Sequence, residues 1–310
     1  MTATDVQRVA EAALRWVSEH RDGFRLGDDA LAPDTDVNMS WKPLGELAQT
    51  CVCVRRHTRP GSFLHDTATD LLGHAWHETR DGALFLDLQR LEPSATYPLE
   101  VYAAFASDGL RYAPYEKFVA TVVRTRGWRT TEQQPNRRLG ILNTERRSGF
   151  TPHDATPVAL RRTWLGNLPE PWTFEKTAGY TLTHVVFHLT DWGHDVRAVP
   201  EDIATYLDTW LPPWIDSCVE AQQWDLCCEL LAVAASLPQP PPPVTIDDAW
   251  TALALAQDAS GALTEIGRGP RGEDVPLVFV NCYHSTLVAA FAATLTAARR
   301  GDETRQGAPA

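Results

Sequence analysis

Two histidines and an aspartate share one face of a helix that the sequence predicts to start at Thr181. His184, His188 and Asp191 fall at positions i, i+4 and i+7, and an apolar stripe lies opposite them. Imidazoles titrate near neutral pH, so this stripe can supply a catalytic acid and base, with Asp191 orienting the His188 ring, or a metal-binding pair. The alternative is that they are core histidines with ordinary hydrogen-bond partners. Val185 stands where a metallopeptidase would carry its glutamate, which argues against that class.

A second group with potential chemistry is Cys282-Tyr283-His284. A thiol beside an imidazole can act as an activated nucleophile or bind Zn²⁺, so Cys282, His284 and His184 are the metal candidates if a metal is bound. We predict no cofactor, with zinc as the alternative. His284 is also a catalytic candidate. The alternative is that the group is structural, with a buried cysteine beside a histidine that caps a helix.

Two tyrosines and two glutamates are the candidate substrate-binding residues. Tyr97 and Tyr180 open two of the predicted helices, and Glu100 follows Tyr97 by three positions. Glu229 lies within an apolar run, where a carboxylate needs a partner or a function unless it faces solvent.

An internal repeat predicts how these residues are brought together. Residues 97–108 read YPLEVYAAFASD, residues 283–294 read YHSTLVAAFAAT, and residues 180–191 read YTLTHVVFHLTD. The position of His184 is occupied by Val101 and Leu287 in the other copies, so the fold does not require an imidazole there. If the three helices are parallel around one axis, Cys282, His284, Glu100 and His184 lie at a common mouth.

The repeats predict an all-α protein, and their unequal spacing favours a closed α/α barrel over an open solenoid. The run from Asp70 to Trp76 resembles that from Asp225 to Leu231, and Trp164-Leu165-Gly166 takes the same place before the third copy. This suggests three units of an outer and an inner helix, with extra pairs. We expect one domain over residues 1–298 and a disordered tail over residues 299–310.

Local signals refine this outline. Thr4 and Gln7 form a predicted capping box for the first helix. A polar loop is expected over residues 27–43. The polyproline run 238–243 is a stiff spacer or, alternatively, a recognition ligand.

Composition restricts the class of protein further. The chain has 310 residues, 44% of them apolar, and a net charge of −12, which opposes nucleic-acid binding and favours a cationic ligand. The arginine-rich stretch 124–147 is either a solvated surface or a docking patch for an acidic partner. We predict no membrane span and no signal peptide, and therefore a cytoplasmic location with six free cysteines.

The segments YPLEVYAAFASDGL, YTLTHVVFHLTDWG, CYHSTLVAAFA and WDLCCELL resemble an actinobacterial helical-repeat family of about this length. The resemblance covers most of the chain and implies a link to gene clusters that make modified peptides. The architecture also resembles the α/α barrels of lanthionine cyclases. Those enzymes hold zinc at the barrel mouth with two cysteines and one histidine, including an adjacent Cys-His pair. Here Tyr283 separates Cys282 from His284, so the resemblance implies the fold more strongly than the metal.

Three functions remain open at this stage. The first is a tailoring enzyme for a ribosomal peptide or other natural product, such as a thioether-forming cyclase in which His184 or His284 deprotonates a thiol. The second is a non-catalytic scaffold that binds a peptide or partner enzymes. The third is a carbohydrate-active α/α barrel, for which Glu100, Asp191 and Glu229 are the candidate carboxylates.

Overall fold

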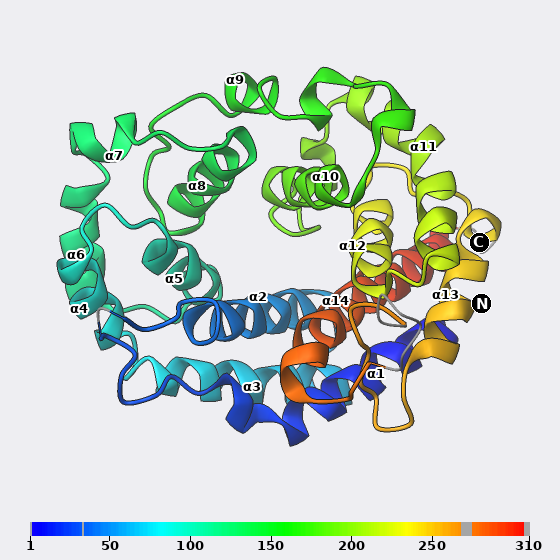
Figure 1. Ribbon diagram of the computed structural model, residues 1–310, viewed down its shortest axis with the longest axis horizontal. Helices are drawn as coiled ribbons and strands as arrows, with labels where there is room; N and C mark the ends of the chain where they lie inside the picture. The colour runs from blue at the N-terminus through cyan, green and yellow to red at the C-terminus, as the bar shows by residue number, and fades with distance from the viewer. Residues whose placement is uncertain (1, 33, 268–274, 307–310) are drawn as a thin grey trace.

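The computed structural model describes residues 2–32, 34–267 and 275–306 (Figure 1). Within these ranges the regular elements are helices and no strand is present, which confirms the all-α class. The α-helices are α1 (Ala3–Glu19), α2 (Trp41–His57), α3 (Phe63–Glu78), α4 (Ala83–Leu91), α5 (Tyr97–Ser107), α6 (Ala113–Val122), α7 (Arg126–Thr130), α8 (Pro135–Arg147), α9 (Thr156–Leu160), α10 (Lys176–Leu189), α11 (Glu201–Glu220), α12 (Trp224–Ala235), α13 (Asp247–Ala256) and α14 (Phe279–Gln306). No helix of the described part is long and apolar enough to cross a bilayer.

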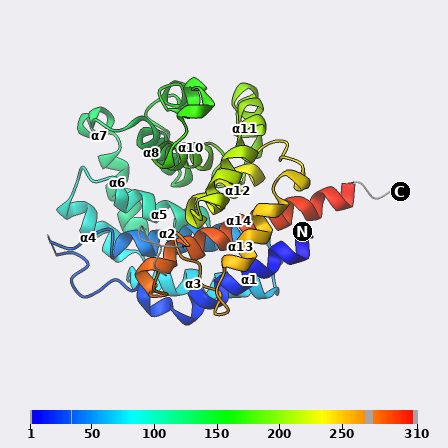
Figure 2. The same ribbon diagram turned by 45° about the vertical axis from the view of Figure 1, so that its right-hand side comes forward.

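Six helices form a continuous cycle of contacts. The cycle runs α2, α5, α8, α10, α12 and α14, and α14 packs back on α2. Figure 1 shows these six around the centre, with α1, α3, α4, α6, α7, α9, α11 and α13 outside them. Figure 2 shows α1 and α3 beneath α2 and α14, in agreement with their contacts. Each of these six helices therefore packs on the one before it and the one after it in the cycle.

The inner helices all begin at the same end of the ring. Neighbouring inner helices are parallel, because a contact early in one helix meets an early residue of its neighbour and a later contact meets a later residue. The successive pairs are Gly45–Val101 and Arg55–Asp108 for α2 and α5, Glu100–Arg137 and Ser107–Arg147 for α5 and α8, Gly140–His188 and Arg147–Asp191 for α8 and the end of α10, and Tyr180–Asp225 and Thr183–Glu229 for α10 and α12. The starts of α2, α12 and α14 meet at His284, which contacts Glu46 and Asp225. The predicted parallel arrangement of the helices near residues 97, 180 and 283 is therefore confirmed.

Two glycines let inner helices approach closely. A Cβ atom at Gly45 would lie 2.8 Å from a methyl group of Val101, and one at Gly140 would lie 2.8 Å from Nε2 of His188. Glycine at position 140 therefore makes room for an imidazole between α8 and α10, at the usual entropic cost of glycine in a helix.

The assignment of outer and inner helices from the second motif was wrong. Residues 70–76 lie on α3 outside the ring, but residues 225–231 lie on α12, an inner helix. Trp164 precedes a short 3-10 turn, Leu165–Asn167, and does not belong to an outer α-helix. The run from Asp225 to Leu231 is buried on all sides, so its composition does not distinguish the two layers.

Both chain ends differ from the prediction. The capping box of α1 is formed by Thr2 and Asp5 instead of Thr4 and Gln7. At the other end α14 continues to Gln306, so the tail does not begin at residue 299. Arg299 donates to the carbonyl oxygens of Leu237 and Pro238, and this anchors the last turns of α14. Residues 307–310 lie outside the described part of the chain. The polyproline run separates α12 from α13, as a spacer does.

Candidate functional site

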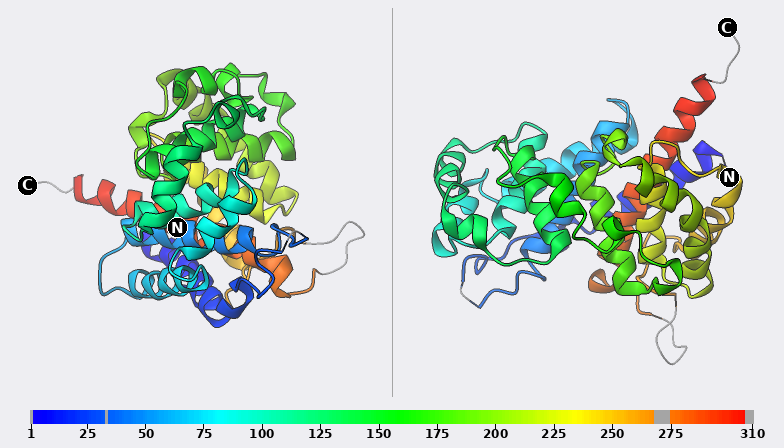
Figure 3. Two further views of the ribbon diagram at one scale, coloured as in Figure 1. Left: turned by 90° about the vertical axis from the view of Figure 1, so that its left-hand side faces the viewer. Right: turned by 90° about the horizontal axis from the view of Figure 1, so that it is seen from above.

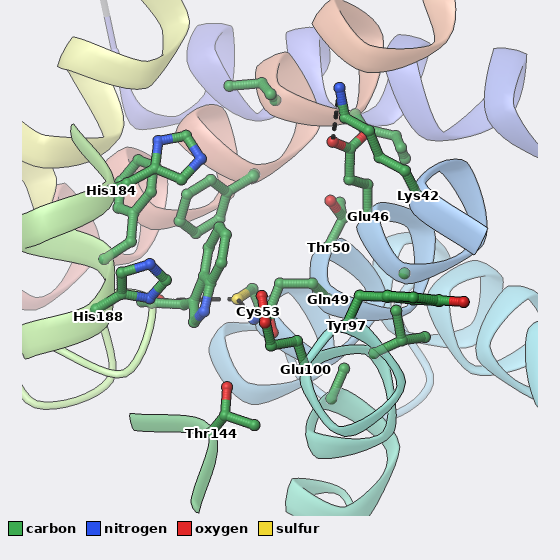
Figure 4. Close-up of a pocket in the computed structure, with 18 of the residues that line it drawn as sticks. Lys42, Glu46, Gln49, Thr50, Cys53, Tyr97, Glu100, Thr144, His184 and His188 are labelled. Carbon is green, nitrogen blue, oxygen red and sulfur yellow. Dashed lines mark hydrogen bonds and ion pairs between the residues drawn. The ribbon is translucent and has the colours of Figure 1, made fainter. Parts of the chain in front are cut away.

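A cavity of about 530 Å³ occupies the centre of the ring, and all six inner helices line it. This volume lies within the range of small-molecule sites. The apolar part of its wall includes Trp41, Val101, Phe187, Leu287 and Phe291, and the polar part includes Glu46, Glu100, His184, His188, Glu229 and His284. Figure 4 shows His184 and His188 on one side of the cavity, with Glu46, Tyr97 and Glu100 across from them.

The tautomer of His184 is set by its own helix. Its Nδ1 lies 2.8 Å from the carbonyl oxygen of Tyr180, one turn earlier, and must donate to that oxygen. Nε2 of a neutral ring then carries the free electron pair. The side chain is 40% exposed and lines the cavity, and Nε2 has no hydrogen-bond partner among the described residues. His184 is therefore oriented as a proton acceptor toward the cavity.

Glu229 connects two of the histidines. Its carboxylate is buried, accepts a hydrogen bond from Thr183, and lies 3.7 Å from Nδ1 of His184 and 3.8 Å from Nε2 of His284. Burial raises the pKa of Glu229, a proton on His184 lowers it, and the nearby Asp225 raises it further. The carboxylate can stabilise a proton on either ring. The predicted need of Glu229 for partners is confirmed.

Three carboxylates surround His284. Its Nδ1 lies 2.9 Å from Glu46, and its Nε2 lies 3.4 Å from Asp225, which also accepts a hydrogen bond of 2.6 Å from the hydroxyl of Tyr180. Burial lowers the pKa of His284, but the three negative charges outweigh it and raise the pKa to about 10. His284 is therefore an imidazolium at neutral pH, in contrast to the free base suggested for it.

His188 differs from both. Burial, together with the charges of protonated His184, Arg147 and Arg137, lowers the pKa of His188 to about 3, so its ring is neutral. The ring lies against Gly140, and the predicted partner Asp191 is engaged elsewhere. The three histidines of the cavity thus have three different environments.

Asp191 belongs to an ionic cluster at the opposite end of the ring. Its carboxylate lies 3.0 Å from Arg56 and 3.0 Å from Arg147, and Arg147 donates to Gln49 and Ser107. The prediction that Asp191 orients the His188 ring is therefore wrong, because two arginines bind its carboxylate. The side chain of Arg147 lines the cavity and is 6% exposed. We call the ring with its central cavity the cup, and we call this ionic cluster the floor of the cup.

The other predicted residues divide between the cavity and its surroundings. Tyr97 and Glu100 line it, and Glu100 is paired with Arg137 at 2.7 Å. Tyr180 lies behind the wall through its bond to Asp225. Cys282 is buried away from the cavity, and burial raises the pKa of its thiol to about 11. No set of three histidine, cysteine, aspartate or glutamate side chains in the described ranges is arranged to bind a metal ion.

Three residues of the site were not predicted: Glu46, Asp225 and Arg147. A signal existed for Asp225, which precedes Glu229 by one helical turn and therefore shares its face. Arg147 belonged to a stretch that we expected to be solvated or to dock a partner, and Glu46 meets His284 across 238 residues of sequence. These two required the tertiary structure.

Comparison with known proteins gives a family for the chain. No curated protein and no solved structure matches it. One family model matches residues 10–294, which includes all six inner helices except the last turns of α14. The chain therefore belongs to the family described as Domain of unknown function (DUF6895).

Proposed function

We propose that this protein is an enzyme that modifies a peptide or other natural-product precursor by proton transfer in the central cavity. The observation that carries the proposal is the pair of imidazoles on Glu229. His184 is fixed with Nε2 free, and His284 is held as a cation. A neutral base and a fixed positive charge near one buried carboxylate suit an addition in which a proton leaves one atom and a negative charge develops on another.

Formation of a thioether by addition of a thiol to a dehydroamino acid is a reaction of this kind. Nε2 of His184 takes the thiol proton, and the sulfur forms a bond to the β-carbon. The π electrons of the carbon–carbon double bond move onto the α-carbon and its carbonyl as an enolate, next to the positive charge of His284. Protonated His184 then delivers the same proton to the α-carbon, so no atom is gained or lost. Glu229 stabilises the imidazolium between the two transfers.

The wall of the cavity fits a substrate with apolar groups. Aromatic and aliphatic side chains form much of it, whereas the carboxylates of Glu46 and Glu100 are already paired with His284 and Arg137. A peptide segment with apolar side chains matches this wall. The carbohydrate-active alternative is less well supported, because Asp191 is committed to two arginines and Glu100 to Arg137.

The test uses precursor peptides encoded beside the gene, dehydrated chemically, and follows the loss of free thiol by alkylation and mass spectrometry. We expect conversion by the wild-type protein and loss of conversion in His184→Gln, with His20→Gln as the matched control because His20 lies on the outside, stacked on Trp16. Equal conversion by His184→Gln would remove this residue from the mechanism. Binding of the peptide without conversion would favour the scaffold function.

A further inference from the structure

A second cleft, remote from the central cavity, lies on the outer layer. It is formed by the end of α6, by α7 and by residues 149–153 after α8, on the side of the molecule that faces the viewer in the left panel of Figure 3. Its volume is also about 530 Å³. Its lining consists of Ala120, Val123, Arg124, Arg129, Gly149, Phe150, Thr151, Pro152 and His153. The cleft therefore has an apolar base and two arginines.

The charge of this region is opposite to that of the whole molecule. Residues 124–147 contain seven arginines and two acidic residues, whereas the chain carries a net charge of −12. Four of these arginines are used inside the protein: Arg137 pairs with Glu100, Arg147 with Asp191, Arg138 bonds to His153, and Arg146 to Asn143.

Three arginines are left for another role. Arg124, Arg126 and Arg129 are exposed, and none forms an ion pair with a carboxylate of the described residues. Arg124 makes a single bond, from Nε to the carbonyl oxygen of Ala120, so the rest of its guanidinium group is free to bind. Arginine suits such a surface because its planar fork binds carboxylates with two parallel hydrogen bonds.

A buried carboxylate fixes the shape of the cleft. Glu145 accepts hydrogen bonds from the indole of Trp128 at 2.8 Å, from the backbone nitrogen of His153 at 3.0 Å, and from Nδ1 of the same histidine at 2.8 Å. Nε2 of His153 in turn accepts a bond from Arg138, which also donates to the carbonyl oxygen of Thr131. These bonds tie α7 and residues 149–153 to α8, so the cleft is formed before any ligand arrives.

We propose that this cleft is a docking site for an acidic peptide segment that carries apolar side chains. The arginines bind the carboxylates of the segment, and the base formed by Val123 and Phe150 binds an apolar side chain between them. A peptide fits better than a nucleic acid, because three free arginines are few for a phosphate backbone and the molecule as a whole repels it. The proposal does not depend on the reaction in the central cavity.

The experiment measures fluorescence anisotropy with a short fluorescein-labelled peptide of alternating glutamate and leucine residues. We expect saturable binding that weakens with added salt, and no binding of the same peptide with lysine in place of glutamate. The variant Arg124→Glu/Arg129→Glu should weaken binding by about tenfold or more. Arg59→Glu/Arg197→Glu makes the same charge change at exposed positions elsewhere and should bind like the wild type.

Two further probes separate the alternatives. Phe150→Ala should weaken binding of the peptide, because the apolar contact is part of the recognition. Displacement of the peptide by an equal concentration of inorganic phosphate would show a site for small anions, and tighter binding of a single-stranded RNA of equal charge would show a nucleic-acid surface. Either result, or equal weakening by the two double variants, would overturn the proposal. An unchanged melting temperature of Arg124→Glu/Arg129→Glu shows that its fold is intact.

Discussion

At the scale of residues, the three histidines of the cavity differ in the number of carboxylates beside them. His188 lacks a carboxylate and stays neutral, His284 has three and stays charged, and His184 shares one of those three while its Nε2 faces the cavity. Of the three, His184 is the one whose Nδ1 is bonded to its own helix and whose Nε2 has no partner among the described residues. The proposed proton transfer therefore falls to a side chain whose counterparts in the repeat, Val101 and Leu287, also line the cavity.

Replacement of His184 by leucine should separate function from stability. Leucine occupies the equivalent position 287, so we expect the melting temperature to stay unchanged or to rise. Turnover should fall by roughly two to four orders of magnitude, the usual contribution of a general acid or base. A thermal melt and the thiol-loss assay on one purified variant measure both quantities. A strongly destabilised protein would mean that the bond to the carbonyl oxygen of Tyr180 is structural.

The charge of His284 should make stability depend on alkaline pH. Its pKa rises from the ordinary value of 6.5 to about 10 in the folded protein. A group with a raised pKa stabilises the fold fully below its unfolded pKa, and this contribution is lost as the pH rises through the folded pKa. We therefore expect a falling melting temperature between about pH 7 and pH 10.

The variant Glu46→Gln tests the origin of that shift. Because Glu46 raises the pKa of His284 more than Asp225 or Glu229 does, its replacement should move the titration of the ring toward neutral pH. Nuclear magnetic resonance of the His284 ring protons measures this directly. Asp66→Asn, an acid on α3 outside the ring, is the control. An unchanged titration in Glu46→Gln would mean that the pair at 2.9 Å does not form in solution.

At the scale of elements, the floor of the cup joins the ends of four inner helices. Asp191 and the following Trp192 adopt left-handed backbone angles, with φ of 48° and 59°, which non-glycine residues rarely do. The two arginines on Asp191 hold this turn against α2 and α8. An acid at a helix C-terminus is unfavourable, and the two arginines compensate for it, which the sequence alone does not reveal.

Removal of the negative charge from the floor should destabilise the protein. Asp191→Asn leaves Arg147 buried without a charged partner, which costs about 3–5 kcal/mol in comparable cases. Urea unfolding measures the change. The double variant Arg147→Met/Asp191→Asn should recover part of the loss, because it removes the unpaired buried charge. If the double variant is less stable than Asp191→Asn, the arginine stabilises the fold through Gln49 and Ser107 instead.

The inner helices were predictable to different degrees, for a physical reason. The helices α5, α10 and α14 repeat a tyrosine and a run of small or apolar residues, so one copy reports on the others. Helix α12 is apolar except for Asp225 and Glu229, so these two acids alone indicate which side meets the cavity, and α2 belongs to no copy of the repeat. The histidines were found because they break the repeat, whereas Glu46 breaks no pattern in its own helix.

At the scale of the whole molecule, α14 closes the ring and joins it to the outer layer. It packs on α1, α2 and α12, and its Arg300 lies 2.8 Å from Asp247 of α13. The C-terminal turns of α14 therefore connect the last helices of the chain, a role that the composition of residues 299–310 did not suggest because arginine and alanine are frequent in tails.

Two truncations should separate the anchored part of α14 from the rest. A chain that ends at Arg300 keeps the bonds to residues 237, 238 and 247, so we expect its melting temperature to match that of the full chain. A chain that ends at Ala298 loses all of them and should melt several degrees lower. Differential scanning calorimetry compares the two. Equal melting temperatures would mean that Arg299 and Arg300 contribute nothing to the fold.

The floor has a consequence for the passage of a substrate. Arg147 lines the cavity on this side, is 6% exposed, and is held by Asp191, Gln49 and Ser107. If the floor closes this side of the ring, a long peptide substrate cannot thread through and enters as an end or as a bent loop. Product and substrate would then use the same opening. Accumulated product should in that case compete with substrate for the free protein, and a bulky group attached on both sides of the reacting segment should slow its entry more than one attached on a single side.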